Sequence, residues 1–202
     1  MQIGRFQKVS IDQFSKDTNN NDNTIYEDII LPKRATTGSA GYDFVCPFNI
    51  TLKPGQNIKI PTGIRCQMEE GYVLNIYPRS SFGIKHQMFL SNTVGIIDSD
   101  YYYANNQGHI IISIINMGDH DIIINKGERF VQGIFLKFYT ASEEEISESR
   151  HGGFGSTGKE CAHSSTDRAF DSDSKGCRFN SCWARQGDFL CTTAQFNTIH
   201  IY

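Results

Sequence analysis

The chain has 202 residues, which is enough to bury one sizeable core and does not require two independent domains. Lys and Arg number 19 against 22 Asp and Glu, so the formal net charge of −3 excludes a general attraction to nucleic acid or to an anionic membrane. Any anionic ligand must therefore be held by a local site.

The first residues, Met1–Phe6, lack the basic and apolar pattern of a secretion signal, and no stretch approaches 18 consecutive apolar residues. We therefore expect a soluble, cytoplasmic protein. Cys46 and Cys66 are the only cysteines of the first 158 residues, and the other four crowd the end of the chain. This asymmetry argues against a disulfide framework in the main domain.

In chain order, the first element is a short helix predicted at Ser10–Gln13 from a capping-box pattern, and Asp17–Asn23 reads as a polar, disordered loop or linker. Short runs rich in β-branched and aromatic residues then predict strands, and turn signals separate them as in a β-sandwich or barrel. The predicted strands are Ile58–Ile60, Tyr72–Tyr77, His109–Ile115, Ile122–Ile124 and Phe130–Tyr139.

Four segments follow from this pattern. Residues 1–25 are expected to form an N-terminal extension with the polar loop, and residues 26–140 a β-barrel that contains the core. Residues 141–158 combine an acidic linker with a glycine-rich arm, and residues 159–202 form a tail of unknown role.

The glycine-rich stretch Gly152–Gly158 is the first segment whose residues suggest a ligand-binding role. Glycines let backbone N–H groups approach phosphate oxygens closely, and Arg150, Ser156 and Thr157 add charge and donors. A flexible linker explains the same composition, and the segment is not a Walker loop.

Two further segments carry polar groups at strand ends. Tyr77–Gly83 presents an arginine and two hydroxyls, which suit a phosphate, although a turn with a structural ion pair fits equally. Asn92–Tyr101 carries Asp98 and Asp100 on an apolar background, where a carboxylate in a cleft acts as a general base. The alternative is a hairpin with acidic turn residues.

Taken together, five segments resemble, in order, the five motifs of the trimeric dUTPase family, and the resemblance covers residues 26 to 158. It implies an all-β fold, a jelly-roll-like distorted β-barrel, which assembles as a homotrimer with active sites shared between subunits and a flexible C-terminal arm. The five segments are Ala40–Asp43, Pro78–Gly83, Gly95–Tyr101, Gly127–Gln132 and Gly153–Gly158.

The resemblance implies hydrolysis of dUTP to dUMP and pyrophosphate, which limits uracil in DNA and supplies dUMP for thymidylate synthesis. Asp98 matches the carboxylate that orients and deprotonates the attacking water, and Gln132 matches a ligand near the α-phosphate. Arg79 is expected to pair with Asp43 and to organise the phosphate site. Mg²⁺ is the implied cofactor, held mainly by substrate phosphates and water rather than by a protein cage.

The implied substrate contacts divide by chemistry. The Asn92 hairpin reads uracil, Tyr101 packs on the deoxyribose, and Phe154 caps the base. Hydroxyls of the second motif bind phosphate, and Arg150 reaches the γ-phosphate, although it stands closer to Phe154 than in many members. The implied substrate-binding residues are Ser80, Ser81, Gly83, Asn92, Gly95, Ile97, Tyr101, Arg150, Phe154, Gly155, Ser156 and Thr157.

Several alternatives stay open at this point. Tyr102–Gln107 lengthens the uracil hairpin and is expected to extend beyond the pocket. The tail matches nothing in the family; it reads as disordered or as non-native sequence, and its cysteines lack the short spacings typical of zinc sites. Expected partners are dUTP and other copies of the chain, without nucleic acid or membrane, and a regulatory protein partner remains an alternative. A dCTP deaminase relative and a structural β-barrel are less favoured.

Overall fold

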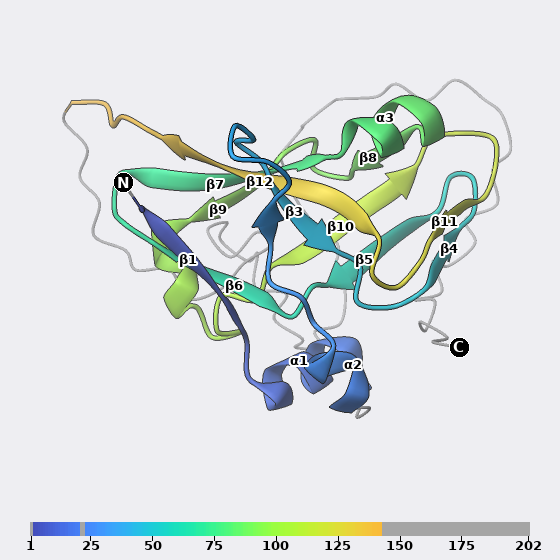
Figure 1. Cartoon of the computed structure of the whole chain (residues 1–202), viewed down its shortest axis with the longest axis horizontal. Helices are drawn as coiled ribbons and strands as arrows, with labels where there is room; N and C mark the ends of the chain where they lie inside the picture. The colour runs from blue at the N-terminus through green and yellow to red at the C-terminus, as the bar shows by residue number, and fades with distance from the viewer. Residues whose placement is uncertain (1, 21–22, 143–202) are drawn as a thin grey trace, which may run out of the picture. The chain divides into compact units, whose positions relative to one another are not determined.

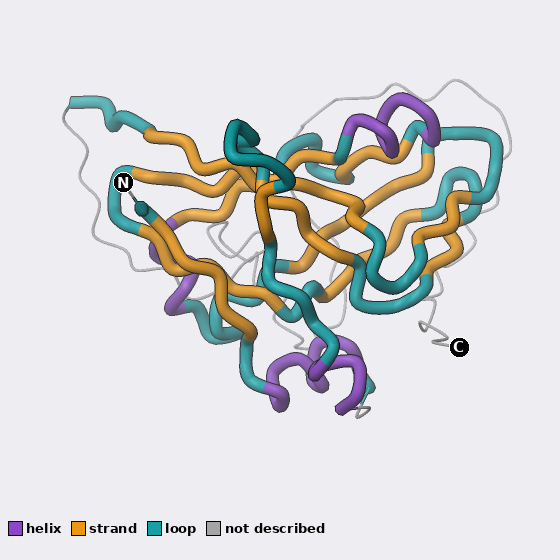
Figure 2. Tube along the Cα trace, viewed as in Figure 1, coloured by secondary structure: helices purple, strands orange, loops and turns teal. Residues whose placement is uncertain are grey.

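The computed structural model describes residues 2–20 and 23–142, which form a β-rich unit with short helices at its periphery (Figures 1 and 2). The strands are β1 (Gly4–Lys8), β2 (Lys33–Arg34), β3 (Tyr42–Val45), β4 (Ile50–Leu52), β5 (Asn57–Pro61), β6 (Ile64–Met68), β7 (Tyr72–Pro78), β8 (Met88–Leu90), β9 (Gly95–Asp98), β10 (Ile111–Asn116), β11 (Ile122–Ile124) and β12 (Arg129–Lys137). The helices are α1 (Ile11–Thr18), α2 (Asn23–Glu27), α3 (Ser80–His86) and the 3₁₀ turn η1 (Ser99–Tyr103).

The strands pair antiparallel in four sheets, which confirms the all-β, jelly-roll-like prediction. The five-stranded sheet has the order β2-β3-β12-β7-β9, and β5-β10-β8, β4-β11 and β1-β6 complete the barrel. Within the part of the chain that the structure describes, no helix is long and apolar enough to cross a membrane.

The core lies between these sheets and consists of branched and aromatic side chains. Leu74 and Ile76 of β7 and Phe130 of β12 are fully buried, and burial of such a side chain stabilises the fold by about 1.5–3 kcal/mol. Cys46 and Cys66 are also buried and free, and burial raises the pKa of each thiol to about 12. Neither thiol therefore serves as a nucleophile at neutral pH.

The N-terminal region differs from the expectation. Ser10 caps α1 as predicted, since its hydroxyl accepts a hydrogen bond from Gln13 N at 3.2 Å, but the helix runs to Thr18 and takes up the first part of the expected loop. Val9 and Phe14 are 1% and 2% exposed, so the core extends beyond residue 26 toward the N-terminus. Eight residues are too few for a helical period to stand out in the sequence.

Two segments expected as a turn and a hairpin extension also take defined places on the barrel. The segment after Pro78 forms α3, whose Phe82 side chain is buried. The insert after Tyr101, which was expected to extend beyond the pocket, lies against β1, where Tyr102 donates a hydrogen bond to Gln7 at 2.6 Å. The predicted arm and tail lie outside the described residues, so their boundaries stay predictions.

Candidate active site

Three of the five segments meet in one pocket of about 380 Å³. The first segment supplies its residues from the start of β3, the second from the junction of β7 and α3, and the fourth from β12. These elements adjoin because β3 and β7 pair with opposite edges of β12. The lining residues are Ala35, Ser39, Ala40, Gly41, Asp43, Arg79, Ser80, Gln132 and Ile134.

The charge centre of this pocket is Asp43, which is buried and receives two guanidinium groups. Arg79 Nε lies 3.1 Å from Asp43 Oδ1, which is the ion pair that the resemblance implies, and Arg129 Nη1 lies 3.0 Å from Asp43 Oδ2. Arg79 also donates to the carbonyl oxygen of Arg129 at 3.2 Å. Two cations face one carboxylate, so the group carries a net positive charge and suits an anion.

Sequence reasoning missed Arg129 in this role. It stands inside the fourth segment, but its partner Asp43 lies 86 residues earlier in the chain. Only the pairing of β3 with β12 brings the two side chains together.

Gln132 sits in the same pocket and closes against Gly41. Gln132 pairs with Asp43 across the β3–β12 ladder, and its Nε2 lies 3.5 Å from the carbonyl oxygen of Pro78. A Cβ added at Gly41 would stand 2.4 Å from Gln132 Oε1, a distance that real Cβ atoms do not adopt. The absent side chain at Gly41 therefore makes room for the Gln132 amide.

The remaining residues of the second segment lie on α3. Ser80 lines the pocket, whereas Ser81 and Gly83 are not among its lining residues. Ser80 and Ser81 are both exposed, and a Cβ at Gly83 would meet nothing within 4 Å. Both hydroxyls are thus open to a ligand that approaches the start of α3.

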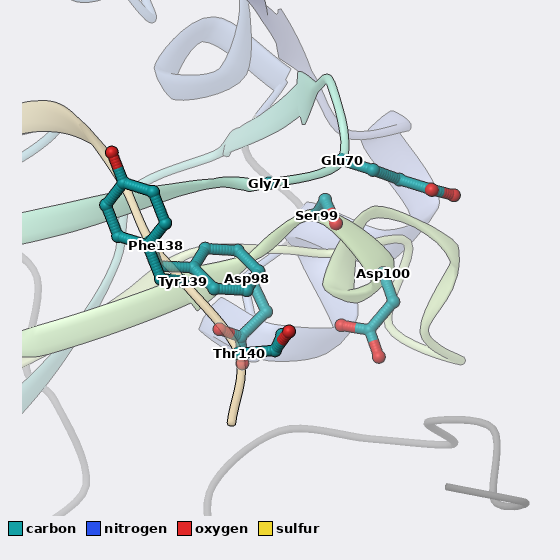
Figure 3. A pocket seen from close by; sticks show the side chains of 8 residues that line it. All are labelled: Glu70, Gly71, Asp98, Ser99, Asp100, Phe138, Tyr139 and Thr140. Atoms are coloured by element: carbon teal, nitrogen blue, oxygen red, sulfur yellow. The ribbon is translucent and has the colours of Figure 1, made fainter. Parts of the chain in front are cut away.

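Asp98 lies elsewhere, at the end of β9, where it lines an open pocket of about 610 Å³ (Figure 3). Figure 3 shows the side chains at the β9–η1 junction near those of the segment that follows β12. This pocket is lined by Glu70, Gly71, Asp98, Ser99, Asp100, Phe138, Tyr139 and Thr140.

The other residues of the predicted uracil hairpin surround β9. Asn92 is exposed in the turn before the strand, while Ile97 is half-buried and packs against the core. A Cβ at Gly95 would lie 3.0 Å from Cβ of Ile76, so close packing of β9 on β7 favours glycine there. Tyr101 is 6% exposed, and its hydroxyl donates to the carbonyl oxygen of His109 at 2.8 Å.

A model of the dUTPase family matches residues 27–158, which is more than half of the chain and includes all five segments. The chain belongs to the dUTPase family. The deoxyuridine 5'-triphosphate nucleotidohydrolase of Lactococcus lactis is 45% identical over 133 residues, covering 64% of this chain and 89% of that protein. The one from Paraburkholderia xenovorans is 42% identical over 137 residues, with the same coverage.

Solved structures agree with this family. The dUTPase of Streptococcus mutans is 35% identical with a TM-score of 0.55, over 68% of this chain and 98% of that one. The dUTPase of phage phi11 of S. aureus has the same TM-score over 73% and 97% of the two chains at 19% identity, which supports the fold alone. Residues 2–20, which form β1 and α1, precede the region that the family model matches.

Within a single copy of this dUTPase-family chain, Asp98 and the Arg79 pocket do not meet. Asp98 pairs with Val73 on β7, whereas Gln132 pairs with Tyr77, four residues further along that strand. The geometry of a sheet then places the Cα atoms of Asp98 and Gln132 roughly 17 Å apart. Asp98 and Gln132 nevertheless share one sheet face, because paired and alternate residues point to the same side.

The fifth segment is not part of this description. Arg150, Phe154, Gly155, Ser156 and Thr157 lie outside the described residues, so their predicted roles stay predictions. Of the predicted site residues, the structure brings Asp43, Arg79, Ser80 and Gln132 together in one pocket and places Asp98 and Tyr101 in another region.

The contact of Gly41 with Gln132 gives a first testable prediction. The variant Gly41→Ala is expected to fold, because the new methyl group displaces only the flexible end of Gln132, but to lower kcat for dUTP by about tenfold through misplacement of that amide. Thermal unfolding and steady-state kinetics measure the two effects. Gly38→Ala is the matched control in the same loop before β3, since its Cβ would meet nothing within 4 Å. Equal kcat values for the two variants would contradict the assignment.

Proposed function

We propose that the chain is a dUTP pyrophosphatase that hydrolyses dUTP to dUMP and pyrophosphate in a homotrimer with shared active sites. Family membership supports the reaction, since the curated relatives carry the name deoxyuridine 5'-triphosphate nucleotidohydrolase. The observation that carries the proposal is the pocket lined by Asp43, Arg79, Ser80 and Gln132, in which Asp43 pairs with Arg79 and also with Arg129 outside the lining. A triphosphate is the ligand that this donor set fits best.

The separation of Asp98 and Gln132 on one sheet face supports an assembly with shared active sites, for which we propose the homotrimer. The opposite face of the sheet is buried, but this face leaves Ile96 62% and Leu136 41% exposed. Exposed apolar side chains on one face of a sheet favour cover by another protein surface. A neighbouring copy placed against this face lets Asp98 of one protomer serve the phosphate pocket of another.

For the chemical step, we assign the general base to Asp98 and the phosphate contacts to the Arg79 pocket. Asp98 accepts a proton from water, whose oxygen bonds to the α-phosphorus, while the bond from that phosphorus to the oxygen bridging the β-phosphate breaks. Gln132 and Ser80 donate hydrogen bonds to the phosphate oxygens, and Arg79 offsets their negative charge. The products are dUMP and pyrophosphate.

Magnesium fits this site as a partner of the substrate. The pocket offers hydrogen-bond donors and guanidinium groups, and its carboxylate at Asp43 is already engaged by Arg79 and Arg129. These groups bind phosphate oxygens and not a cation, so Mg²⁺ would be held by the triphosphate and water, as in many nucleotide sites. When bound, it supplies charge neutralisation and polarises the phosphorus.

Base and sugar contacts are carried over from the family pattern. Asn92 with the backbone of Gly95 and Ile97 would read uracil, and Tyr101 would lie under the deoxyribose without room for a 2′-hydroxyl. The arm would add its aromatic ring at Phe154 over the base, and Ser81 and Gly83 would approach the phosphates from α3. The arm's phosphate contacts would come from Arg150, Gly155, Ser156 and Thr157.

The test is pyrophosphate release from dUTP, dCTP, dTTP and UTP, each with Mg²⁺ and with excess EDTA. We expect release from dUTP with Mg²⁺, at least about 100-fold slower release from the other three, and a strong loss with EDTA. Light scattering of the same sample should give about three times the chain mass of 22.8 kDa. A protein that releases ammonia from dCTP, or a trimer inactive on all four, would overturn the proposal.

A further inference from the structure

The loop between β9 and β10 carries Tyr101, and hydrogen bonds inside the loop fix its phenol. Tyr101 Oη donates to the carbonyl oxygen of His109 at 2.8 Å and accepts from Asn106 Nδ2 at 2.8 Å. The amide of His109 donates in turn to the carbonyl oxygen of Asn106 at 3.1 Å. The position of the Tyr101 ring therefore depends on the position of the His109 backbone.

His109 itself is held from the N-terminal region. Its ring is fully buried, and its Nε2 accepts a hydrogen bond from the backbone N–H of Gly63 at 2.7 Å. Since Nε2 accepts, the proton of the neutral ring is on Nδ1, which donates to Asp17 Oδ2 at 2.5 Å. Asp17 is on α1, so this contact ties the helix to the loop.

The surroundings keep Asp17 charged. Burial raises the pKa of its carboxyl, but hydrogen bonds from His109 and Gln13 and the charge of Lys16 together hold the pKa below its ordinary value of 3.8. Gln13 Nε2 donates to the same oxygen, Asp17 Oδ2, at 2.8 Å. The carboxylate is thus a fixed acceptor at neutral pH.

Two more contacts join the same segments. Ser10, the N-cap of α1, donates its backbone N–H to Gln107 Oε1 at 2.8 Å and accepts from Gln107 Nε2 at 2.9 Å. Tyr102 donates to Gln7 and stacks under the guanidinium of Arg65, 3.6 Å from the ring centroid. The loop is therefore tied along its length to residues that precede the family match at 27–158.

We propose that Asp17, acting through His109, is a positioning residue for Tyr101, and that the segment Gln7–Asp17 sets the discrimination between deoxyribose and ribose. This inference rests on the proposed function, because it gives Tyr101 the sugar contact. Loss of the Asp17 acceptor leaves a buried Nδ1–H without a partner, so His109 shifts toward a new one. Its carbonyl oxygen moves with it, and the Tyr101 hydroxyl follows.

The experiment compares the wild type with Asp17→Ala and Asp17→Asn in the full chain, by calorimetric titration with dUMP and with UMP. Asp17→Ala is expected to narrow the dUMP-to-UMP affinity ratio by about tenfold. Asp17→Asn keeps a carbonyl acceptor for His109 and should stay within about threefold of the wild-type ratio. Asp12→Ala is the matched control, since Asp12 is an exposed aspartate on the same helix.

A purely structural role for Asp17 makes a different prediction. Asp17→Ala would then lower the melting temperature while the folded protein keeps the wild-type affinity ratio, and that result would overturn the proposal. If Asp17→Ala does not fold, Gln107→Ala removes a second tie of the loop and should narrow the ratio by about threefold; an unchanged ratio would likewise overturn it.

The two proposals fail in distinguishable ways. If the wild type hydrolyses dUTP and binds dUMP more tightly than UMP, and the variants keep this preference, only the role proposed for Asp17 is wrong. If the wild type neither hydrolyses dUTP nor binds dUMP, the proposed function is wrong, and so is the positioning role that rests on it.

Discussion

The variant Asp98→Asn is expected to lower kcat for dUTP by about 10²–10⁴-fold, the usual contribution of a general base. Asn keeps the shape of the side chain but does not accept a proton from water at neutral pH. Binding of dUMP and the melting temperature should change little, because the side chain is at a strand end outside the core. Pyrophosphate release and calorimetry measure the two effects.

Asp100→Asn is the matched control for Asp98→Asn. Asp100 lies in the same pocket two residues later but is exposed on η1. The kcat of the Asp100→Asn variant should stay within about threefold of the wild-type value. If the two variants lose activity equally, or if Asp98→Asn stays active, the base is another group.

The same variant tests whether the active site is shared. Asp98→Asn and Gln132→Ala each damage one half of the site, and in a shared arrangement a mixed trimer contains sites with both residues intact. Unfolding and refolding an equal mixture should restore about a quarter of the wild-type activity, the fraction expected from random assembly in a cyclic trimer. Activity no higher than the mean of the two separate variants would place Asp98 and Gln132 of each site in one protomer.

The variant Gly108→Ala is expected to cost about 2–5 kcal/mol of stability and to weaken dUMP binding. Gly108 has a φ of +70°, and an added Cβ would lie 2.7 Å from both the carbonyl oxygen of Tyr101 and Cα of Tyr102. These neighbours are backbone atoms, so the loop itself has to move. Urea unfolding at one fixed protein concentration and calorimetry with dUMP measure the changes.

Gly55→Ala isolates the backbone part of this effect. Gly55 has nearly the same φ, +73°, but a Cβ there would meet nothing within 4 Å. Gly55→Ala should lower the free energy of unfolding by only about 1–2 kcal/mol and leave dUMP binding unchanged. A Gly108→Ala protein as stable as Gly55→Ala would mean that the loop accommodates the methyl group.

The sequence predicted best those strands whose own residues favour extended backbone without help from a distant partner. Ile122–Ile124 matches β11, and Ile58–Ile60 lies within β5, because runs of β-branched residues favour strands wherever they fall. The strand β1 was missed, since Gly4–Lys8 has a single large apolar residue. It forms through pairing with β6, a partner 60 residues away that no local pattern reveals.

In the candidate active site, too, some features were predictable from the sequence and others depend on pairing between distant strands. The order of five short motifs predicted the ion pair of Asp43 with Arg79, because the resemblance carried a spatial pairing that local composition lacks. The support of Gln132 by Gly41 and the second guanidinium of Arg129 depend on the register of β3 against β12. The separation of Asp98 from this pocket likewise depends on where β9 pairs along β7.

The ties between α1 and the loop after β9 also constrain the order in which the protein matures during synthesis. Asp17 and His109 are 92 residues apart in the chain, so a ribosome that adds roughly 5–20 residues per second leaves the helix without this partner for roughly 5–18 seconds. A chain released early, before residue 109, has most of the barrel strands but lacks the His109 partner of Asp17. Asp17, although made early, is thus among the last residues to reach its final contact, and the loop between β9 and β10 is tied to α1 through His109 only from then on.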